Sequence, residues 1–369
     1  MAKANIKNER AKRGFFKWLR GAEGCAPATV DRVEQAILRY EDFTKHEDFA
    51  LFNSDKAEAF KKWLGKREVK GKPLSVVTYH TYLRYLRKFF TWLAWQPGYR
   101  SRIRPDMVAF LRASEKEARM ATQTIPRNYP PLDYVLKLTN SIPAATEIDQ
   151  RDRALLAFTL LSGMRDKAIA TLPLGCFEET PLTVNQNPRK GVQTKFAKLI
   201  PTTLFVFDQG LLNYLLSWVA HLKAKGFGSQ APLFPRARLT QGTDGMSFES
   251  PSEVEPVYWQ GTGGIRAVFK RRAEQAGLPY FPPHTFRHLA VDLALKACKT
   301  GEQIKAVSQN FGHENIATSL SSYGNFDPLR LSEVVRGLDF SQKNTQVGSD
   351  KHLVEQMKKL LLANNDRML

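Results

Sequence analysis

The segment that most constrains how this chain can fold is a proline-rich stretch at residues 121–131, ATQTIPRNYPP. It contains three prolines and little apolar periodicity, which is typical of a linker between domains. At 369 residues, the chain also exceeds the roughly 100–200 residues of a typical domain. We therefore expect an N-terminal domain over residues 1–120, a second domain over residues 132–340, and a C-terminal tether and amphipathic helix over residues 341–369.

Apolar residues on the N-terminal side of this linker recur at the spacing of α-helices. The pattern predicts helices over residues 28–44, 53–67 and 74–95, the last with an apolar stripe from Val76 to Leu93. The N-terminal domain is therefore expected to be helical.

The second domain combines helical and strand-like patterns. Residues 148–163 predict a helix that ends at a glycine, and strand-like stretches follow at residues 171–177, 182–187 and 192–203. Residues 226–263 are rich in Gly, Ser, Pro and Glu, and we interpret them as a long surface insertion. The expected fold class is mainly α (α+β), with a small antiparallel β-sheet in a mostly helical second domain.

The chain is strongly basic, with 55 lysines and arginines against 36 acidic residues and a net charge of +19. Residues 1–127 carry 27 basic and 14 acidic side chains, whereas residues 128–369 carry 28 and 22. An excess of this size indicates a polyanionic partner, with nucleic acid favoured over an acidic membrane. Arg84, Arg87 and Lys88 surround the apolar stripe of one predicted helix and are candidate DNA contacts, although a solvated helix face would give the same pattern.

Cysteine usage and hydropathy indicate a cytoplasmic protein. Cys25, Cys176 and Cys298 form neither a CxxC pair nor an even set, which suggests a reducing compartment. The basic N-terminus lacks the apolar stretch of a secretory signal, and no segment approaches the ~18 apolar residues of a membrane span. We therefore expect no membrane association.

A histidine-rich helix start, PPHTFRHLAVDLA at residues 282–294, is the first candidate for chemistry. His284 and His288 are four residues apart, as in zinc proteases, but no glutamate follows the first histidine and no third ligand is evident. A basic helix start with one histidine in the core is a second interpretation. A third is that His284 and Arg287 share one helix face, where they could hold an anionic oxygen and move a proton.

The order of several reactive residue types resembles that of the tyrosine recombinases, the phage integrase family. An arginine follows a helix, a lysine lies in a predicted hairpin, His-Thr-Phe-Arg opens a helix, and a Gly-His pair precedes a tyrosine. The residues are Arg165, Lys195, His284, Arg287, His313 and Tyr323. Each is a weak signal alone, and the ordered set carries the resemblance.

The resemblance covers most of the chain and implies a division of labour between its domains. It implies an N-terminal core-binding domain that contains the helix at residues 74–95, and a catalytic domain after the linker. The implied activity is site-specific exchange of DNA strands, with double-stranded DNA as the partner. Because exchange between two duplexes needs four active sites, we expect a homotetramer assembled on DNA.

The family's chemistry assigns roles to three of these residues. A DNA phosphodiester is wrapped in negative charge, so cleavage requires neutralisation of its non-bridging oxygens. Arg165 and Arg287 would do this, because a guanidinium donates two parallel hydrogen bonds and stays charged. Tyr323 would attack phosphorus, form a 3′-phosphotyrosyl bond and expel a 5′-hydroxyl.

Proton transfer falls to the remaining members of the set. His284 could accept the phenolic proton and His313 could donate a hydrogen bond to a phosphate oxygen, but the sequence leaves open which histidine does which. The resemblance assigns protonation of the leaving oxygen to a lysine in the hairpin. Lys195 matches that position best, and Lys190 and Lys198 are the alternatives.

Two departures from the family pattern bear on this assignment. Family members often carry glutamate three positions after the first arginine, where this chain has Ala168, and Asp166 could orient Arg165 in its place. The spacing from the histidine to the tyrosine is often nine, whereas His313 and Tyr323 are ten apart. Neither departure removes a reacting group.

No cofactor is expected, and the absence of a carboxylate cluster among these motifs argues against a catalytic magnesium. A type IB topoisomerase shares the chemistry and remains an alternative, as does a non-catalytic DNA-binding protein on the same scaffold. Residues 349–364 predict an amphipathic helix that either folds back on its own domain or docks on a neighbouring protomer.

Overall fold

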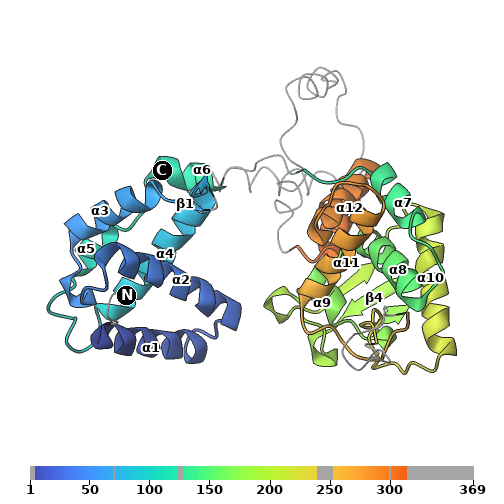
Figure 1. Ribbon diagram of the computed structural model, residues 1–369, viewed down its shortest axis with the longest axis horizontal. Helices are drawn as coiled ribbons and strands as arrows, with labels where there is room; N and C mark the ends of the chain where they lie inside the picture. The colour runs from blue at the N-terminus through green and yellow to red at the C-terminus, as the bar shows by residue number, and fades with distance from the viewer. Residues whose placement is uncertain (1–4, 70, 123–127, 239–251, 299–300, 314–369) are drawn as a thin grey trace, which may run out of the picture. The chain divides into compact units, whose positions relative to one another are not determined.

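The chain divides into two compact units, Met1–Gln123 and Thr124–Leu369, each with its own buried core (Figure 1). The computed structural model describes most of the chain, namely residues 5–69, 71–122, 128–238, 252–298 and 301–313. The C-terminal extension predicted over residues 341–369 lies outside these ranges, as does the amphipathic helix within it. The last two residues of helix α6 (Glu115–Thr122) lie within the linker predicted over residues 121–131.

The N-terminal unit is helical, as the periodicity predicts. In chain order, its other elements are α1 (Ile6–Gly21), α2 (Pro27–Thr44), the 3-10 helix η1 (Phe49–Leu51), α3 (Ser54–Gly65), the short strands β1 (Glu68–Val69) and β2 (Lys72–Pro73), α4 (Val76–Leu93) and α5 (Pro105–Ala109).

Helix α4 is the centre of this unit, since it packs against α1, α2, α3, α5 and α6. Ser75 caps its first turn by accepting a hydrogen bond from the backbone N–H of Thr78 at 3.2 Å. Aromatic side chains fill the core beneath it, with the rings of Phe52 and Phe90 stacked at 4.0 Å between centroids. The apolar stripe predicted along this helix is therefore its buried face.

The C-terminal unit places a small sheet on a helical body. Its elements are α7 (Leu132–Asn140), α8 (Glu147–Ser162), α9 (Asp166–Ala170), η2 (Leu174–Cys176), β3 (Phe177–Glu178), β4 (Thr183–Gln186), η3 (Pro188–Lys190), η4 (Lys195–Ala197), β5 (Ile200–Thr203), α10 (Gln209–Ala224), α11 (Thr262–Gln275), α12 (Pro283–Ala297) and α13 (Gly301–Asn310).

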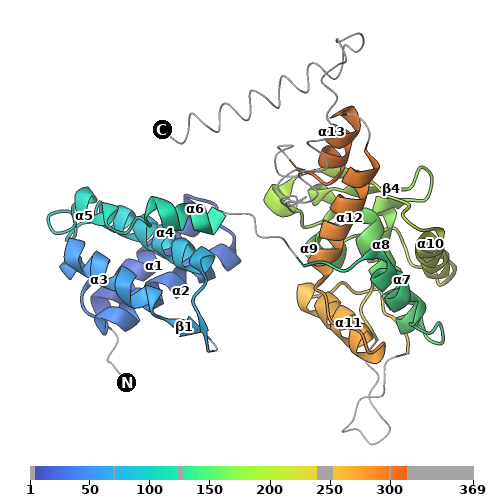
Figure 2. The same ribbon diagram turned by 90° about the horizontal axis from the view of Figure 1, so that it is seen from above.

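Helix α8 forms the core of this unit and packs against α7, α10 and α12 (Figure 1, Figure 2). It is buried along almost its whole length, including the polar Asp149, Arg151 and Asp152. A reciprocal cap starts the helix, because Thr146 accepts from the N–H of Asp149 while the Asp149 carboxylate accepts from the N–H of Thr146. Gly163 ends it in the left-handed conformation, as the sequence predicts.

The three strands form an antiparallel meander in the order β3-β4-β5, which confirms the predicted small sheet. The strand expected over residues 192–203 is shorter than predicted, because only β5 at its end pairs with β4. Lys195 therefore lies in a 3-10 turn of the connection between β4 and β5 rather than on a strand. At the outer edge of β5, the Asn310 side chain accepts from the N–H of Thr203 at 2.7 Å and donates to its carbonyl at 2.9 Å.

The interpretation of residues 226–263 as a surface insertion is wrong for the described parts of that segment. Leu233 and Phe234 are completely buried, and Trp218 of α10 donates a hydrogen bond to the Leu233 carbonyl at 2.9 Å. Further along, Val254 is also buried and pairs with Ala237. The composition of the segment did not indicate these buried apolar residues, because they are few and lie among Gly, Ser and Pro. Residues 239–251 lie outside the described ranges.

No helix in the described ranges is both long and apolar enough to cross a membrane.

Candidate functional site

The turn after α8 delivers Arg165 to the site. Gly163 has φ of +56°, and a Cβ there would lie 2.3 Å from the Phe311 ring, so both the backbone angle and the close approach require glycine. Arg165 then precedes α9 as its N-cap residue and is partly buried. It makes no hydrogen bond or ion pair with another described side chain.

Arg287 lies in the second turn of α12 and ties three segments together. Its Nη1 donates to the Gly163 carbonyl at 2.6 Å, and its Nη2 donates to the Phe311 carbonyl at 2.7 Å. The guanidinium also lies over the Phe311 ring, 5.1 Å from the centroid. Hydrogen bonds from both terminal nitrogens therefore fix the position of the guanidinium.

His313 is held against the same guanidinium, with its Nε2 2.9 Å from Nη2 of Arg287. Because arginine only donates, Nε2 must accept, and the proton of the neutral imidazole is then on Nδ1. The preceding Gly312 has φ of +68°, and a Cβ there would lie 2.6 Å from Ile200 of β5. The Gly-His pair recognised in the sequence thus marks a tight contact between α13 and the sheet.

Arg165, Arg287 and His313 are called here the cationic cluster, and its positive charge is that of the two arginines. Burial lowers the pKa of His313 to about 4, with further contributions from the charges of Arg287 and Arg165. Burial, followed by the charge of Arg165, lowers the pKa of Arg287 to about 9, and burial also lowers the pKa of Arg165. Within the described ranges, no carboxylate forms an ion pair with either arginine. A bound anion would supply the missing negative charge.

The expectation that Asp166 could orient Arg165 is wrong. The Asp166 carboxylate instead accepts two hydrogen bonds from Arg266 of α11, at 3.0 Å from Nε and 2.7 Å from Nη2. Ala168, at the position where the family often has glutamate, is buried in the core. Arg266 has no counterpart in the motifs found in the sequence, because its partner is 100 residues away.

His284 and His288 contact each other at the start of α12. Their Nε2 atoms are 3.0 Å apart, so one ring donates and the other accepts. His288 is buried, which fits the interpretation of one histidine in the core, whereas His284 is exposed. In the part of the chain that the structure describes, no group of three or more His, Cys, Asp or Glu side chains is placed to hold a metal ion.

The candidate lysines lie on the connection between β4 and β5. Lys190 ends η3 and Lys195 begins η4, and both are exposed, whereas Lys198 is partly buried. The connection is anchored to the C-terminal end of α9, because the N–H of Gln193 donates to Thr171 Oγ1 at 2.8 Å. Tyr323, the candidate nucleophile, lies outside the described residues.

The three candidate DNA contacts on α4 line a groove with aromatic walls. Arg84 and Arg87 are exposed, whereas Lys88 forms an ion pair with Glu23 at 2.6 Å. The groove also contains Trp18, Tyr85, Trp92 and Trp95. Cations next to aromatic rings suit a sugar-phosphate backbone with its bases, so this surface is compatible with nucleic acid.

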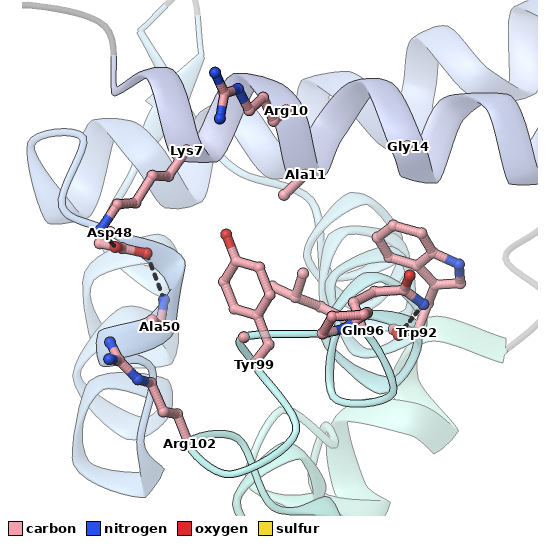
Figure 3. Close-up of a pocket in the computed structure, with 13 residues that line it drawn as sticks. Lys7, Arg10, Ala11, Gly14, Asp48, Ala50, Trp92, Gln96, Tyr99 and Arg102 are labelled. Carbon is pink, nitrogen blue, oxygen red and sulfur yellow. Dashed lines mark hydrogen bonds and ion pairs between the residues drawn. The ribbon is translucent and has the colours of Figure 1, made fainter.

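A second pocket of the N-terminal unit was not foreseen from the sequence (Figure 3). Lys7 and Arg10 of α1 lie on one side and Arg102 on another, while the Tyr99 hydroxyl points towards α1. The Lys7 ammonium is 3.4 Å from the Asp48 carboxylate. Neither Arg10 nor Arg102 forms an ion pair with a carboxylate in the described ranges. These side chains come from segments far apart in the sequence, and the only signal for them was the charge excess of this unit.

No family model and no curated protein matches the chain, but solved structures do. A lambda integrase dimer bound to a COC′ core site is similar with a TM-score of 0.59 at 14% identity, covering 92% of this chain and 99% of that one. XerH site-specific recombinase bound to difH substrate, in a pre-cleavage complex, is similar with a TM-score of 0.54 at 16% identity, covering 89% of this chain and 84% of that one. A lambda integrase tetramer bound to a Holliday junction is similar with a TM-score of 0.57 at 15% identity, covering 92% of this chain and 80% of that one.

At these identities the likeness shows the fold alone. The mostly helical chain with its small antiparallel sheet has the fold of the lambda integrase catalytic domain.

Proposed function

We propose that this chain is a tyrosine site-specific recombinase or integrase that cleaves and rejoins DNA strands through a covalent 3′-phosphotyrosyl intermediate. The observation that carries the proposal is the cationic cluster, in which two arginines and a histidine converge from three separate segments. Neither arginine forms an ion pair with a carboxylate in the described ranges. The shared fold supports the proposal, since the similar structures are recombinases and integrases bound to DNA.

The cluster would act on the scissile phosphate. Arg165 and Arg287 would neutralise its non-bridging oxygens, and burial would strengthen this interaction as negative charge accumulates in the transition state. His313 would donate from Nδ1, because Arg287 occupies its Nε2. It would act as a neutral donor, since its pKa is lowered to about 4.

The covalent step needs one nucleophile and two proton transfers. Tyr323 Oη would attack phosphorus, the P–O5′ bond would break, and the 5′-oxygen would leave as a hydroxyl. His284 would take the phenolic proton, and Lys195 would supply the proton to the leaving oxygen. Rejoining is the reverse, so the bond energy is retained without a nucleotide cofactor. We expect no metal or cofactor in either direction.

The N-terminal unit would bind the duplex through the groove on α4, with Arg84, Arg87 and Lys88 as candidate contacts. The active assembly would be a homotetramer on DNA, the state in which lambda integrase is bound to a Holliday junction.

The test is trapping of a covalent adduct on nicked duplex DNA, selected from a random library for binding to the full-length chain. Wild-type chain should give a denaturant-resistant adduct, whereas Tyr323→Phe should give none and retain DNA affinity. Tyr280→Phe is the matched control, because Tyr280 is a partly exposed tyrosine of the same unit and should not affect the adduct.

An adduct that survives in Tyr323→Phe would assign the attack to another group. A wild-type chain that binds DNA without forming an adduct would favour the non-catalytic alternative. An adduct combined with relaxation of supercoiled DNA, but no joining of two sites, would favour the topoisomerase.

A further inference from the structure

The connection between β4 and β5 exposes an aromatic side chain. Phe196 is 76% exposed, more than any other large apolar side chain in the described ranges. A phenylalanine in water forgoes the free energy that burial would provide. A single exposed apolar side chain is common on protein surfaces, so the case for a partner depends on how the backbone holds this ring and on which groups flank it.

The backbone holds this ring out from the turn. Phe196 and Ala197 have φ of 62° and 51°, a left-handed pair without glycine. Side chains disfavour this conformation, and it concentrates at functional sites. The turn is closed by a hydrogen bond of 2.6 Å from Thr194 Oγ1 to the Lys198 carbonyl.

Both ends of the connection are anchored to segments that carry residues of the cationic cluster. On one side, Gln193 is bonded to Thr171 at the end of α9, the helix that Arg165 precedes. On the other side, Ile200 lies directly against Gly312, the neighbour of the cluster histidine. Ile200 is four positions after Phe196 in the chain, a reach of at most about 14 Å. The ring is therefore within reach of a nucleotide next to a phosphate in the cluster.

Two cations flank the ring. The Nζ atoms of Lys195 and Lys198 lie 4.9 and 5.8 Å from its centroid. A protein partner with an apolar surface would have to accommodate these charges, whereas DNA offers stacked bases for the ring and phosphates for the ammonium groups. Proteins that insert apolar wedges between base steps use this combination.

We propose that Phe196 inserts between stacked bases beside the phosphodiester held by the cationic cluster, unstacks that step, and so helps to determine which phosphodiester is attacked. This rests on the proposed function. Phe196 is a positioning residue here, since it touches a base rather than the reacting atoms.

The test uses full-length chain and a duplex selected from a random library for binding to it. In a series of such duplexes, 2-aminopurine replaces one base at a time, and its fluorescence rises when the base unstacks. Anisotropy of the same samples reports binding, and adduct formation on nicked versions reports the proposed function.

At saturation, wild-type chain should raise the fluorescence several-fold at one or two adjacent positions. Phe196→Ala should remain at the level of free duplex there, with affinity weakened by no more than about tenfold. Phe196→Tyr should restore the signal, and Leu199→Ala is the matched control because Leu199 is 61% exposed on the same connection. On nicked DNA, Phe196→Ala should spread cleavage over neighbouring phosphates.

An equal rise in 2-aminopurine fluorescence with wild type and with Phe196→Ala would overturn the insertion of Phe196 between bases. Binding of the wild type without any rise in fluorescence would overturn it as well. A loss of thermal stability in Phe196→Ala as large as for a buried phenylalanine would show that the ring packs within the protein. If the fluorescence rises with wild type and not with Phe196→Ala but no adduct forms, the proposed function fails; base unstacking by Phe196 then stands, and its role in selecting the attacked phosphodiester is overturned.

Discussion

Arg287 illustrates how much a single residue can organise at this site. Its guanidinium bonds to the end of α8 through the Gly163 carbonyl and to the segment after α13 through the Phe311 carbonyl and His313. The same side chain therefore assembles the cluster and supplies part of its charge. A lysine at this position would keep the positive charge but could not donate hydrogen bonds from two fixed nitrogens as the guanidinium does.

Arg287→Lys should slow single-turnover cleavage of nicked DNA by at least about 100-fold, the usual effect of removing one transition-state donor. DNA affinity should change little, because many phosphate contacts share it. Arg238→Lys is the control, since its pair with Glu253 is exposed and long at 3.5 Å. Near-normal cleavage by Arg287→Lys would mean that charge alone suffices.

The lowered pKa of His313 makes stability depend on pH in a defined window. The folded chain binds this proton with a pKa of about 4, against an ordinary value of 6.5 for histidine, so acid favours the unfolded chain. The contribution of His313 is fully present above pH 6.5 and is lost as pH falls towards 4. The melting temperature should therefore fall between pH 7.5 and 5, and fall less in His313→Gln. Equal falls in both proteins would remove His313 as the cause.

At the scale of elements, the contact between the end of α8 and the segment after α13 depends on a glycine. Gly163→Ala combines a left-handed backbone with a Cβ 2.3 Å from Phe311, whereas Gly191→Ala has a left-handed backbone, at φ of +89°, and open space. The Gly191 variant should lose about 1–2 kcal/mol of unfolding free energy. The Gly163 variant should lose more and also cleave slowly, because Phe311 must shift next to His313. Urea unfolding and cleavage assays would measure both effects. Equal losses of unfolding free energy in the two variants would show that the Phe311 ring can move aside at little cost.

The connection between β4 and β5 carries the proposed general acid. Lys195→Ala should cripple cleavage of ordinary DNA but affect much less a substrate with sulfur at the scissile 5′ bridging position, because a thiolate leaves without a proton. Lys190→Ala and Lys198→Ala are the matched comparisons. If Lys195→Ala is equally defective on both substrates, the acid is one of those lysines or Lys195 only positions the DNA.

The sequence predicted elements better than contacts between them. Periodicity placed α2, α3, α4 and α8 within a few residues, because their buried faces repeat along one segment. It made the strand that ends at Thr203 too long at its start, by including residues 192–199, since apolar character alone does not reveal where pairing begins. It also assigned the wrong partner to Asp166, because a hydrogen bond to Arg266 on α11 has no local signature.

At the scale of the whole molecule, the two units have separate cores, so each should fold by itself. Residues 124–369 expressed alone should retain a cooperative unfolding transition and bind DNA with a shallower dependence of log affinity on log salt, because fewer phosphates are neutralised. In the full chain, Arg84→Ala and Arg87→Ala should each reduce that slope by about one. Anisotropy titrations at several salt concentrations would measure the slopes. An unchanged slope after removal of residues 1–123 would place the DNA contacts entirely in the C-terminal unit.

The asparagine at the end of α13 has a consequence for solubility. The outer edge of β5 would otherwise offer the N–H and carbonyl of Thr203 to any extended chain, and open strand edges are where sheets of different molecules join. The Asn310 amide occupies both groups in the way that a neighbouring peptide would. A single side chain thus closes this edge at Thr203, and an Asn310→Ala chain should aggregate more readily during mild heating even while the cationic cluster remains intact.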